Sequence, residues 1–309
     1  MDVIRLAHLS TPPRALVRPA IAIGNFDGVH RGHAALIATA REVADGGEVC
    51  ALTFEPHPVQ ILAPAVAPVR LTTERRKLEL LASVGADVVV VLPFTTALAA
   101  MPATGFVHAV LGAALGARHV VVGADFTYGQ GRAGTIATLR ADGATAGFDV
   151  TILEPVQVEG AIASSTRVRA ALRAGDLPQA QAVLGRRFDV DGVVVRGAGR
   201  GKGLGIPTAN LAPEGDLAIA GGIYAVTLEV DGVAYPAVAS LGTNPTFVER
   251  GALTLEVHVL DFDRELYGKT VRVSFVARLR DELKYTTVEA LLAQIAVDVA
   301  QARAILATR

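Results

Sequence analysis

Apolar segments of two kinds alternate along the first part of the chain. Short, almost continuous apolar runs are typical of buried strands, and longer segments with apolar positions three and four apart are typical of helices. The expected strands cover residues 20–24, 48–54, 87–92, 119–123 and 149–153. The expected helices cover residues 33–43, 74–83, 105–115 and about 136–144. This alternation predicts a mostly parallel, doubly wound sheet, in which ligands bind outside the carboxyl ends of the strands.

The pattern changes at about residue 188. Strand-like segments follow at residues 190–195, 223–230, 233–240, 253–260 and 271–276, with little helix between them. Asp231-Gly232 is a two-residue hairpin signal. A last helix is expected from Thr286, with Glu289 completing a capping box. We therefore predict two domains, 1–186 and 187–309: a Rossmann-like α/β domain, then an antiparallel β-barrel with a C-terminal helix.

The composition of the chain argues against two classes of protein, disordered proteins and general nucleic-acid binders. The chain has 309 residues, of which 51% are hydrophobic and 19% charged. That apolar content excludes disorder as the dominant state. The net charge of −1 argues against a general nucleic-acid binder, which would carry a basic excess. Any polyanion must therefore be bound locally.

Two features bear on location. Residues 88–117 contain no Asp, Glu, Lys or Arg, but prolines and threonines interrupt them, so we expect a strand, a loop and a helix and no membrane span. The single cysteine, Cys50, excludes a disulfide framework. A cytoplasmic protein is expected.

A glycine-rich segment follows the first expected strand and leads into the first expected helix. Gly24, Asn25, Phe26 and Gly32 lie in it, together with His30 and His33. Glycines let backbone amides approach an anion closely, and two histidines three apart lie on one side of a helix start. They can donate to phosphate oxygens in a transition state. A capped, solvated helix end is the plainer alternative, and a metal site lacks a third ligand nearby.

His30-x-Gly32-His33 resembles the nucleotidyltransferase superfamily, which transfers AMP or CMP from a triphosphate. A second signature of that family is similar to Ser164, Ser165, Thr166 and Arg169. Hydroxyls and amides at a helix N-terminus bind phosphate, and an Arg in the first turn adds positive charge. The resemblance implies ATP as co-substrate and Mg²⁺, with no covalent enzyme intermediate.

Two further segments resemble the flavin-adenylylating branch of that superfamily. Residues 122–129 contain Asp125 and Tyr128, which the resemblance assigns to the flavin site. Residues 53–58 also resemble this branch. They either form a proline-rich turn at the end of a strand or contact the ligand directly.

Glycine also dominates residues 197–205, after the first expected barrel strand. The spacing is not that of a Walker A loop, and a mobile hairpin loop is the alternative. With the Pro-Thr-Ala-Asn that follows, the segment resembles riboflavin kinases. The resemblance implies that Arg200, Gly203 and Gly205 cover ATP and that Thr208 and Asn210 bind Mg²⁺.

Phosphorylation of a hydroxyl needs a group that accepts its proton. Apolar residues take the odd positions of 253–259, so Glu256 and His258 share the other face of the strand. The resemblance makes Glu256 the base, whereas an exposed edge position is the alternative. It also places Arg280 and Tyr285 in the flavin pocket.

From about residue 19 to 301, the chain resembles bacterial bifunctional FAD synthetases. The resemblance implies riboflavin phosphorylation to FMN in the barrel and adenylylation of FMN to FAD in the α/β domain. Riboflavin, FMN, FAD and ATP are the expected partners, without nucleic acid or membrane, and a homo-oligomer is left open. The alternatives are a transferase for another phosphate ester with an inert barrel, and a barrel that docks RNA or protein.

Overall fold

A computed structural model describes residues 1–6, 12–197, 206–243 and 253–307. The chain forms two compact units. The first consists of Met1–Pro68 with Glu74–Ser164, and the second of Val69–Thr73 with Ser165–Arg309.

The first unit is built on a six-stranded parallel sheet in the order β1-β4-β3-β2-β5-β6. Its strands are β1 (Asp2–Arg5), β2 (Ala20–Ile23), β3 (Val49–Glu55), β4 (Val88–Pro93), β5 (His119–Gly123) and β6 (Asp149–Leu153). The five expected strands and their parallel pairing are confirmed. The edge strand β1 was not expected, because only Val3 and Ile4 stand between polar residues in its four positions.

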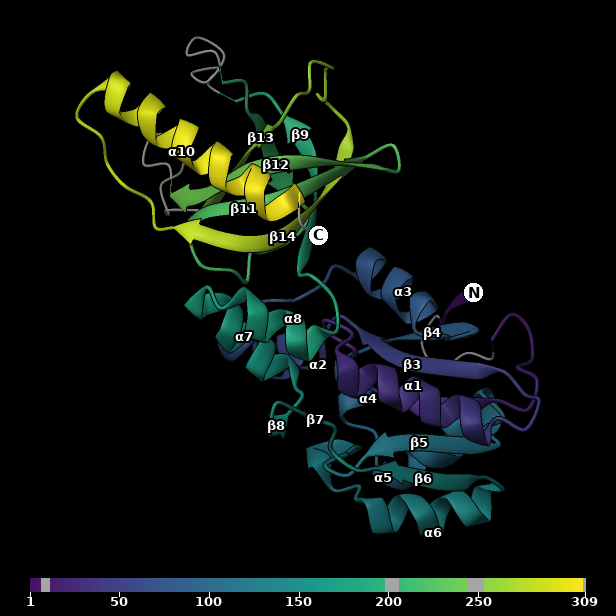
Figure 1. The fold of residues 1–309 in the computed structure, drawn as a ribbon. Helices are drawn as coiled ribbons and strands as arrows, with labels where there is room; N and C mark the ends of the chain where they lie inside the picture. The colour runs from purple at the N-terminus through teal and green to yellow at the C-terminus, as the bar shows by residue number, and fades with distance from the viewer. Residues whose placement is uncertain (7–11, 198–205, 244–252, 308–309) are drawn as a thin grey trace. The chain divides into compact units, whose positions relative to one another are not determined.

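Helices cover both faces of this sheet (Figure 1). α1 (Arg31–Val43) and α3 (Glu74–Ser83) pack on the face that Ala20 and Ala22 of β2 line. η2 (Phe106–Ala114) and α6 (Ile136–Ala146) pack on the opposite face, against Ile21 and Ile23. The helix expected at 105–115 is thus present, but η2 is wound as a π-helix, which the spacing of apolar residues did not indicate.

Shorter elements connect these layers. They are α2 (Pro58–Leu62), η1 (Pro64–Val66), α4 (Thr96–Ala99), α5 (Ala103–Gly105), η3 (Gln130–Arg132), β7 (Gln157–Val158) and β8 (Ala161–Ile162).

The second unit contains a closed barrel in the order β10-β13-β12-β11-β14-β9, with every pairing antiparallel. Its strands are β9 (Asp189–Val195), β10 (Ala209–Pro213), β11 (Gly222–Val230), β12 (Val233–Thr243), β13 (Leu253–Val259) and β14 (Thr270–Arg280). Asp231 and Gly232 both have positive φ, as their hairpin requires. β10 was not among the expected strands, although it closes the barrel between β9 and β13.

α10 (Val288–Ala307) packs against β11, β12 and β14 (Figure 1). Ala302 is fully buried there with Ile223 and Val238. The helix begins at Val288, two residues after the expected start at Thr286, and Thr287 caps it by accepting a hydrogen bond from the Ala290 amide at 3.2 Å. By length and composition alone, α10 is the one helix in the described ranges that could span a membrane.

Two further helices of this unit, α7 (Ser165–Ala174) and α8 (Leu177–Leu184), pack together at the barrel. The carbonyl of Leu172 in α7 accepts a hydrogen bond from the Ala220 amide, just before β11, at 2.9 Å. α8 contacts β14, and the Phe188 carbonyl that follows it accepts from the Phe275 amide of that strand at 2.9 Å.

Candidate functional site

The turn between β2 and α1 brings the two expected histidines together. His30 is the N-cap of α1, and its backbone amide donates to Nδ1 of His33 at 3.3 Å. The two rings stack with centroids 3.7 Å apart. A Cβ at Gly32 would lie 3.1 Å from the His30 ring, so glycine leaves the room that this stacking needs.

The same turn has an unusual backbone. Phe26, Gly28 and Val29 have φ values of 51°, 85° and 40°. For residues other than glycine, this region costs of order 1–3 kcal/mol, and such strain clusters at ligand sites. The Phe26 ring is fully buried, lies against the Cα side of Gly24 and meets the His33 ring edge-on at 5.2 Å. Phe26 therefore shapes the turn from within.

A buried lysine, which the sequence pattern did not reveal, lies under this turn. Lys77 of α3 is completely buried, and its Nζ lies 2.6 Å from Oε1 of Glu55. It also donates to Thr53 Oγ1 at 3.2 Å and to the Asn25 carbonyl at 3.5 Å. The sequence does hold one indication that Lys77 is buried: it lies four residues before Leu81, on the buried face of the helix.

Burial lowers the pKa of His33 well below its ordinary value, and the neighbouring His30 and Lys77 lower it further. The imidazole is therefore neutral near neutral pH. A bound anion would raise that pKa, because an opposite charge favours the protonated form.

The residues assigned to the adenylyltransferase flavin site lie after β5. Asp125 is exposed in the turn that follows the strand. Tyr128 is only 7% exposed, stacks on Phe126, and its hydroxyl lies 3.3 Å from Oγ1 of Thr138. Burial raises the pKa of Tyr128. Its hydroxyl is directed toward α6, and its role toward a flavin stays a prediction.

The second phosphate signature spans the division between the units. Ser164 is the last residue of the first unit, and Ser165, Thr166 and Arg169 belong to the second. Thr166 is exposed in the first turn of α7, as an anion-binding hydroxyl must be. Arg169 is buried, and its Nε donates to the Val69 carbonyl at 2.7 Å.

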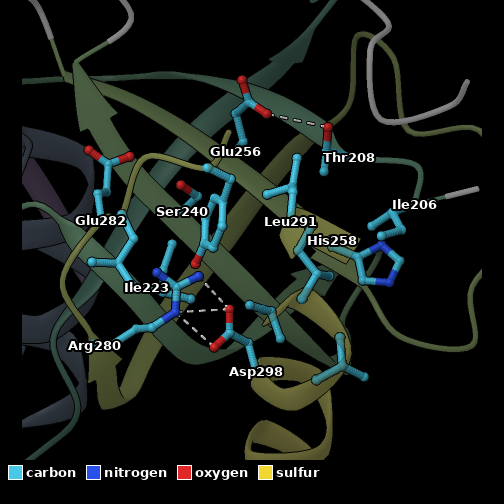
Figure 2. Close-up of a pocket in the computed structure, with 15 residues that line it drawn as sticks. Ile206, Thr208, Ile223, Ser240, Glu256, His258, Arg280, Glu282, Leu291 and Asp298 are labelled. Carbon is cyan, nitrogen blue, oxygen red and sulfur yellow. Dashed lines mark hydrogen bonds and ion pairs between the residues drawn. The ribbon is translucent and has the colours of Figure 1, made fainter. Parts of the chain in front are cut away.

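A cavity of about 310 Å³ lies between the barrel and α10. That volume is within the range of small-molecule pockets, roughly 300–1,000 Å³. Ile223, Val238, Leu291, Ile295 and Val299 supply much of its wall. Figure 2 shows Glu256 and Thr208 at one end, and Arg280 and Asp298 at the other. The cavity is thus apolar in the middle and polar at both ends.

Glu256 occupies the face of β13 that the alternation predicted. Leu255, Val257 and Val259 are buried, whereas Glu256 and His258 line the cavity. Oγ1 of Thr208 lies 3.5 Å from Oε2 of Glu256 (Figure 2).

The strands on either side of β13 place further polar residues opposite Glu256, and one of them, Ser240, also lines the cavity. Asn210 of β10 is paired directly with Glu256, and so is Ser240 of β12. A Cβ at Gly197 would overlap the Asn210 side chain, so a glycine is needed beside it. Neutral oxygens next to a carboxylate suit Mg²⁺, which uses few protein ligands together with phosphates and water. In the described ranges, no group of three or more His, Cys, Asp or Glu side chains could hold a metal by itself.

At the other end, Arg280, which is partly buried, forms a bidentate ion pair with the buried Asp298 of α10, with Nη2 2.7 Å from Oδ2. Asp298 raises the pKa of Arg280. Arg280 also lies 6.0 Å above the Tyr285 ring. The Tyr285 hydroxyl is buried and has no hydrogen-bond partner within the described chain. Arg200, Gly203 and Gly205 lie outside the described residues.

Comparisons with known proteins follow this two-part organisation. The FAD synthetase family matches residues 13–167, and the riboflavin kinase family matches residues 184–306. A solved structure described as a macrolide-efflux protein from Streptococcus pneumoniae aligns with a TM-score of 0.86 at 30% identity. It covers 98% of this chain and 99% of that chain, and supports the fold of both units.

Full-length relatives agree. The bifunctional riboflavin kinase/FMN adenylyltransferase of Pseudomonas fluorescens is 39% identical over 310 residues, covering 99% of this chain and 98% of that protein. The protein of the same name from Bacillus subtilis is 32% identical and covers 96% of each chain. ATP is therefore a co-substrate of both reactions. The chain belongs to the bifunctional riboflavin kinase/FMN adenylyltransferase family, which converts riboflavin to FMN and FMN to FAD.

Proposed function

We propose that the cavity between the barrel and α10 is the riboflavin kinase site, and that the turn between β2 and α1 belongs to the FMN adenylyltransferase site. We also propose that residues 1–186 form the FMN adenylyltransferase domain and residues 187–309 the riboflavin kinase domain. The observation that carries the kinase assignment is the cavity, which has a carboxylate and neutral oxygens at one end and an apolar middle.

In the kinase reaction, Glu256 accepts the proton of the riboflavin hydroxyl as that oxygen forms a bond to the γ-phosphorus of ATP. The bond between that phosphorus and the bridging oxygen breaks, and ADP leaves. Thr208 and Asn210 would hold Mg²⁺, which neutralises charge on the phosphates when bound. Arg200, Gly203 and Gly205 are proposed to cover ATP.

The flavin ring would lie in the apolar middle of the cavity. Arg280 and Tyr285 are proposed to contact its polar edge. An unsatisfied buried hydroxyl costs about 1–3 kcal/mol, so a polar atom of the ligand beside Tyr285 would be favourable.

In the adenylyltransferase reaction, an FMN phosphate oxygen attacks the α-phosphorus of ATP, and pyrophosphate leaves. His30 and His33 donate to the phosphates in the transition state. The proposed ATP-binding residues are Gly24, Asn25, Phe26, Gly32, Ser164, Ser165, Thr166 and Arg169. Asp125 and Tyr128 are proposed to contact FMN.

We propose that both reactions take place in the cytoplasm and that the chain has no nucleic-acid or membrane partner. A homo-oligomer is compatible with this proposal. The ion pair between Arg280 of β14 and Asp298 of α10 supports a role for α10 as a wall of the cavity.

Product analysis tests both sites at once. The full chain is incubated with riboflavin, ATP and Mg²⁺, and the flavins are separated. The His30→Ala/His33→Ala double variant is expected to stop at FMN. Glu256→Gln is expected to leave riboflavin unconverted but still turn added FMN into FAD. Glu229→Gln, on an exposed barrel position, is the matched control. FAD formation by the double histidine variant at the parent rate would refute the first site.

A further inference from the structure

A network of polar groups connects the Glu55 carboxylate with the backbone of the turn between β2 and α1. Nζ of Lys77 lies 2.6 Å from Oε1 of Glu55 and donates to Oγ1 of Thr53 at 3.2 Å. The Thr53 hydroxyl in turn donates to the Asn25 carbonyl, also at 3.2 Å. Lys77 and Thr53 are completely buried. All four residues belong to the first unit, so the network lies within one compact body.

The ammonium group determines which way the Thr53 hydroxyl points. An ammonium group has three donors and no acceptor, so Oγ1 of Thr53 can only accept from Lys77. A hydroxyl has a single proton to donate. That proton is therefore directed away from Lys77 and toward the Asn25 carbonyl.

The network acts where the backbone pairing of β2 with β3 ends. The Gly24 amide, directly after β2, still donates to the Leu52 carbonyl of β3 at 3.1 Å. One residue further along both segments, the Thr53 side chain binds the Asn25 carbonyl in place of a backbone group. The network thus fixes the backbone group that directly precedes Phe26, a residue with positive φ.

The turn that follows must hold two rings in a precise arrangement. Phe26 and Val29 have positive φ, and such a backbone persists only where the surrounding structure determines it. The rings of His30 and His33 stack directly after this turn. Misplacement of a reacting group by about 1 Å can lower a rate by about 100-fold. Loss of the support at Asn25 would therefore be felt at the histidines.

We propose that Lys77 is a positioning residue for FMN adenylylation. Its ammonium group orients the Thr53 hydroxyl on the Asn25 carbonyl, and this contact fixes the turn that leads to the histidine pair. Because Lys77 is completely buried, it acts through Thr53 and not on the substrates. This inference rests on the proposed assignment of the turn to the adenylyltransferase site.

The first test exchanges Thr53 for residues that separate its hydroxyl from its volume. Thr53→Val removes the hydroxyl and keeps a branched side chain of similar size, whereas Thr53→Ser keeps the hydroxyl and removes a methyl group. In Thr53→Val, kcat for FMN adenylylation should fall by about tenfold or more, the scale of a small misplacement. The KM for ATP should change less than kcat, because the histidines are proposed to act in the transition state. Thr53→Ser should retain most of kcat.

The second test removes the ammonium group itself. Lys77→Met/Glu55→Gln removes both charges of the pair together, and with them the donor to Thr53. We expect the same loss of kcat as in Thr53→Val, at a melting temperature near that of the parent chain. Ile4→Ala is the stability control, because Ile4 is buried in β1, which two strands separate from β2. It should lower the melting temperature and leave kcat unchanged. The riboflavin kinase rate should equal that of the parent chain in every variant.

The His30→Ala/His33→Ala variant separates the inference from the function on which it rests. If that variant loses FAD formation while Thr53→Val and the double Lys77 variant keep the parent kcat, the turn belongs to the site but Lys77 does not position it. FAD formation at the parent rate by the double histidine variant would refute the assignment of the turn itself. Equal losses in Thr53→Ser and Thr53→Val, or a loss of kcat in Ile4→Ala, would attribute the effect to packing and overturn the positioning role.

Discussion

Asn210 and Glu256 lie directly opposite one another on the antiparallel strands β10 and β13. Side chains so paired have Cβ atoms about 4.5–5.5 Å apart. The pairing places a neutral amide beside the carboxylate proposed to accept the substrate proton. Thr208, two residues before Asn210, adds a hydroxyl 3.5 Å from the same carboxylate.

The first prediction concerns magnesium. Asn210→Ala removes one of the two proposed oxygen ligands, so the Mg²⁺ concentration for half-maximal riboflavin kinase activity should rise, by about tenfold as for a disturbed metal shell. Asn210→Asp keeps an oxygen and should retain more of the activity. Titration of Mg²⁺ in both assays checks this. An equal shift in the adenylyltransferase assay would contradict a kinase-specific site.

The second prediction concerns pH. The pKa of His33 is depressed in the folded chain, whereas in the unfolded chain it takes its ordinary value of 6.5. Below that value the unfolded state binds a proton that the folded state does not, so the free energy of unfolding should fall as the pH drops. One such proton corresponds to about 1.4 kcal/mol per pH unit.

Urea unfolding between pH 7 and pH 5 measures this slope, and His33→Gln should make it shallower. Burial also lowers the pKa of His119. The slope for His119→Gln is therefore measured as well, for comparison with that for His33→Gln. If the slope in His33→Gln equals that of the parent chain, the pKa of His33 is not depressed by folding.

The third prediction concerns the buried pair below the histidines. Lys77→Met removes the ammonium group that lies 2.6 Å from the Glu55 carboxylate, and breaking a buried pair destabilises by about 3–5 kcal/mol. The double variant Lys77→Met/Glu55→Gln should recover a large part of that loss. Urea unfolding at pH 7 gives both values. Lys77→Met should also raise the pKa of His33, which NMR titration of the ring would report.

The fourth prediction concerns the wall of the cavity. Asp298→Asn removes the charge that holds α10 to Arg280, so the KM for riboflavin should rise, by about tenfold if the loss is near 1.4 kcal/mol. FMN adenylylation should be unaffected. The matched control is Asp261→Asn. It breaks the ion pair between Asp261, whose side chain is 71% exposed, and Arg303 of α10. Such surface pairs contribute about 0–1 kcal/mol. Equal effects of the two substitutions would exclude a specific role for Asp298.

The sequence pattern was sufficient to predict an element where the apolar and polar positions of that one segment identify it. Alternating buried strands and helices predicted the parallel sheet, and the apolar odd positions around Glu256 predicted which face it takes. β1 and β10 carry too few apolar residues to be recognised alone. Each is a strand because it completes an existing sheet, and β10 does so between β9 and β13.

The sequence by itself determined the two-part organisation, the histidine motif and the family to which the chain belongs. Only the tertiary structure decided which distant residues support each site: Lys77 lies under the turn of the histidines, and Asp298 holds Arg280 at the cavity. Buried charges need partners, and the partner of a buried charge is selected by packing across the fold. Neighbouring positions in the sequence therefore cannot reveal it.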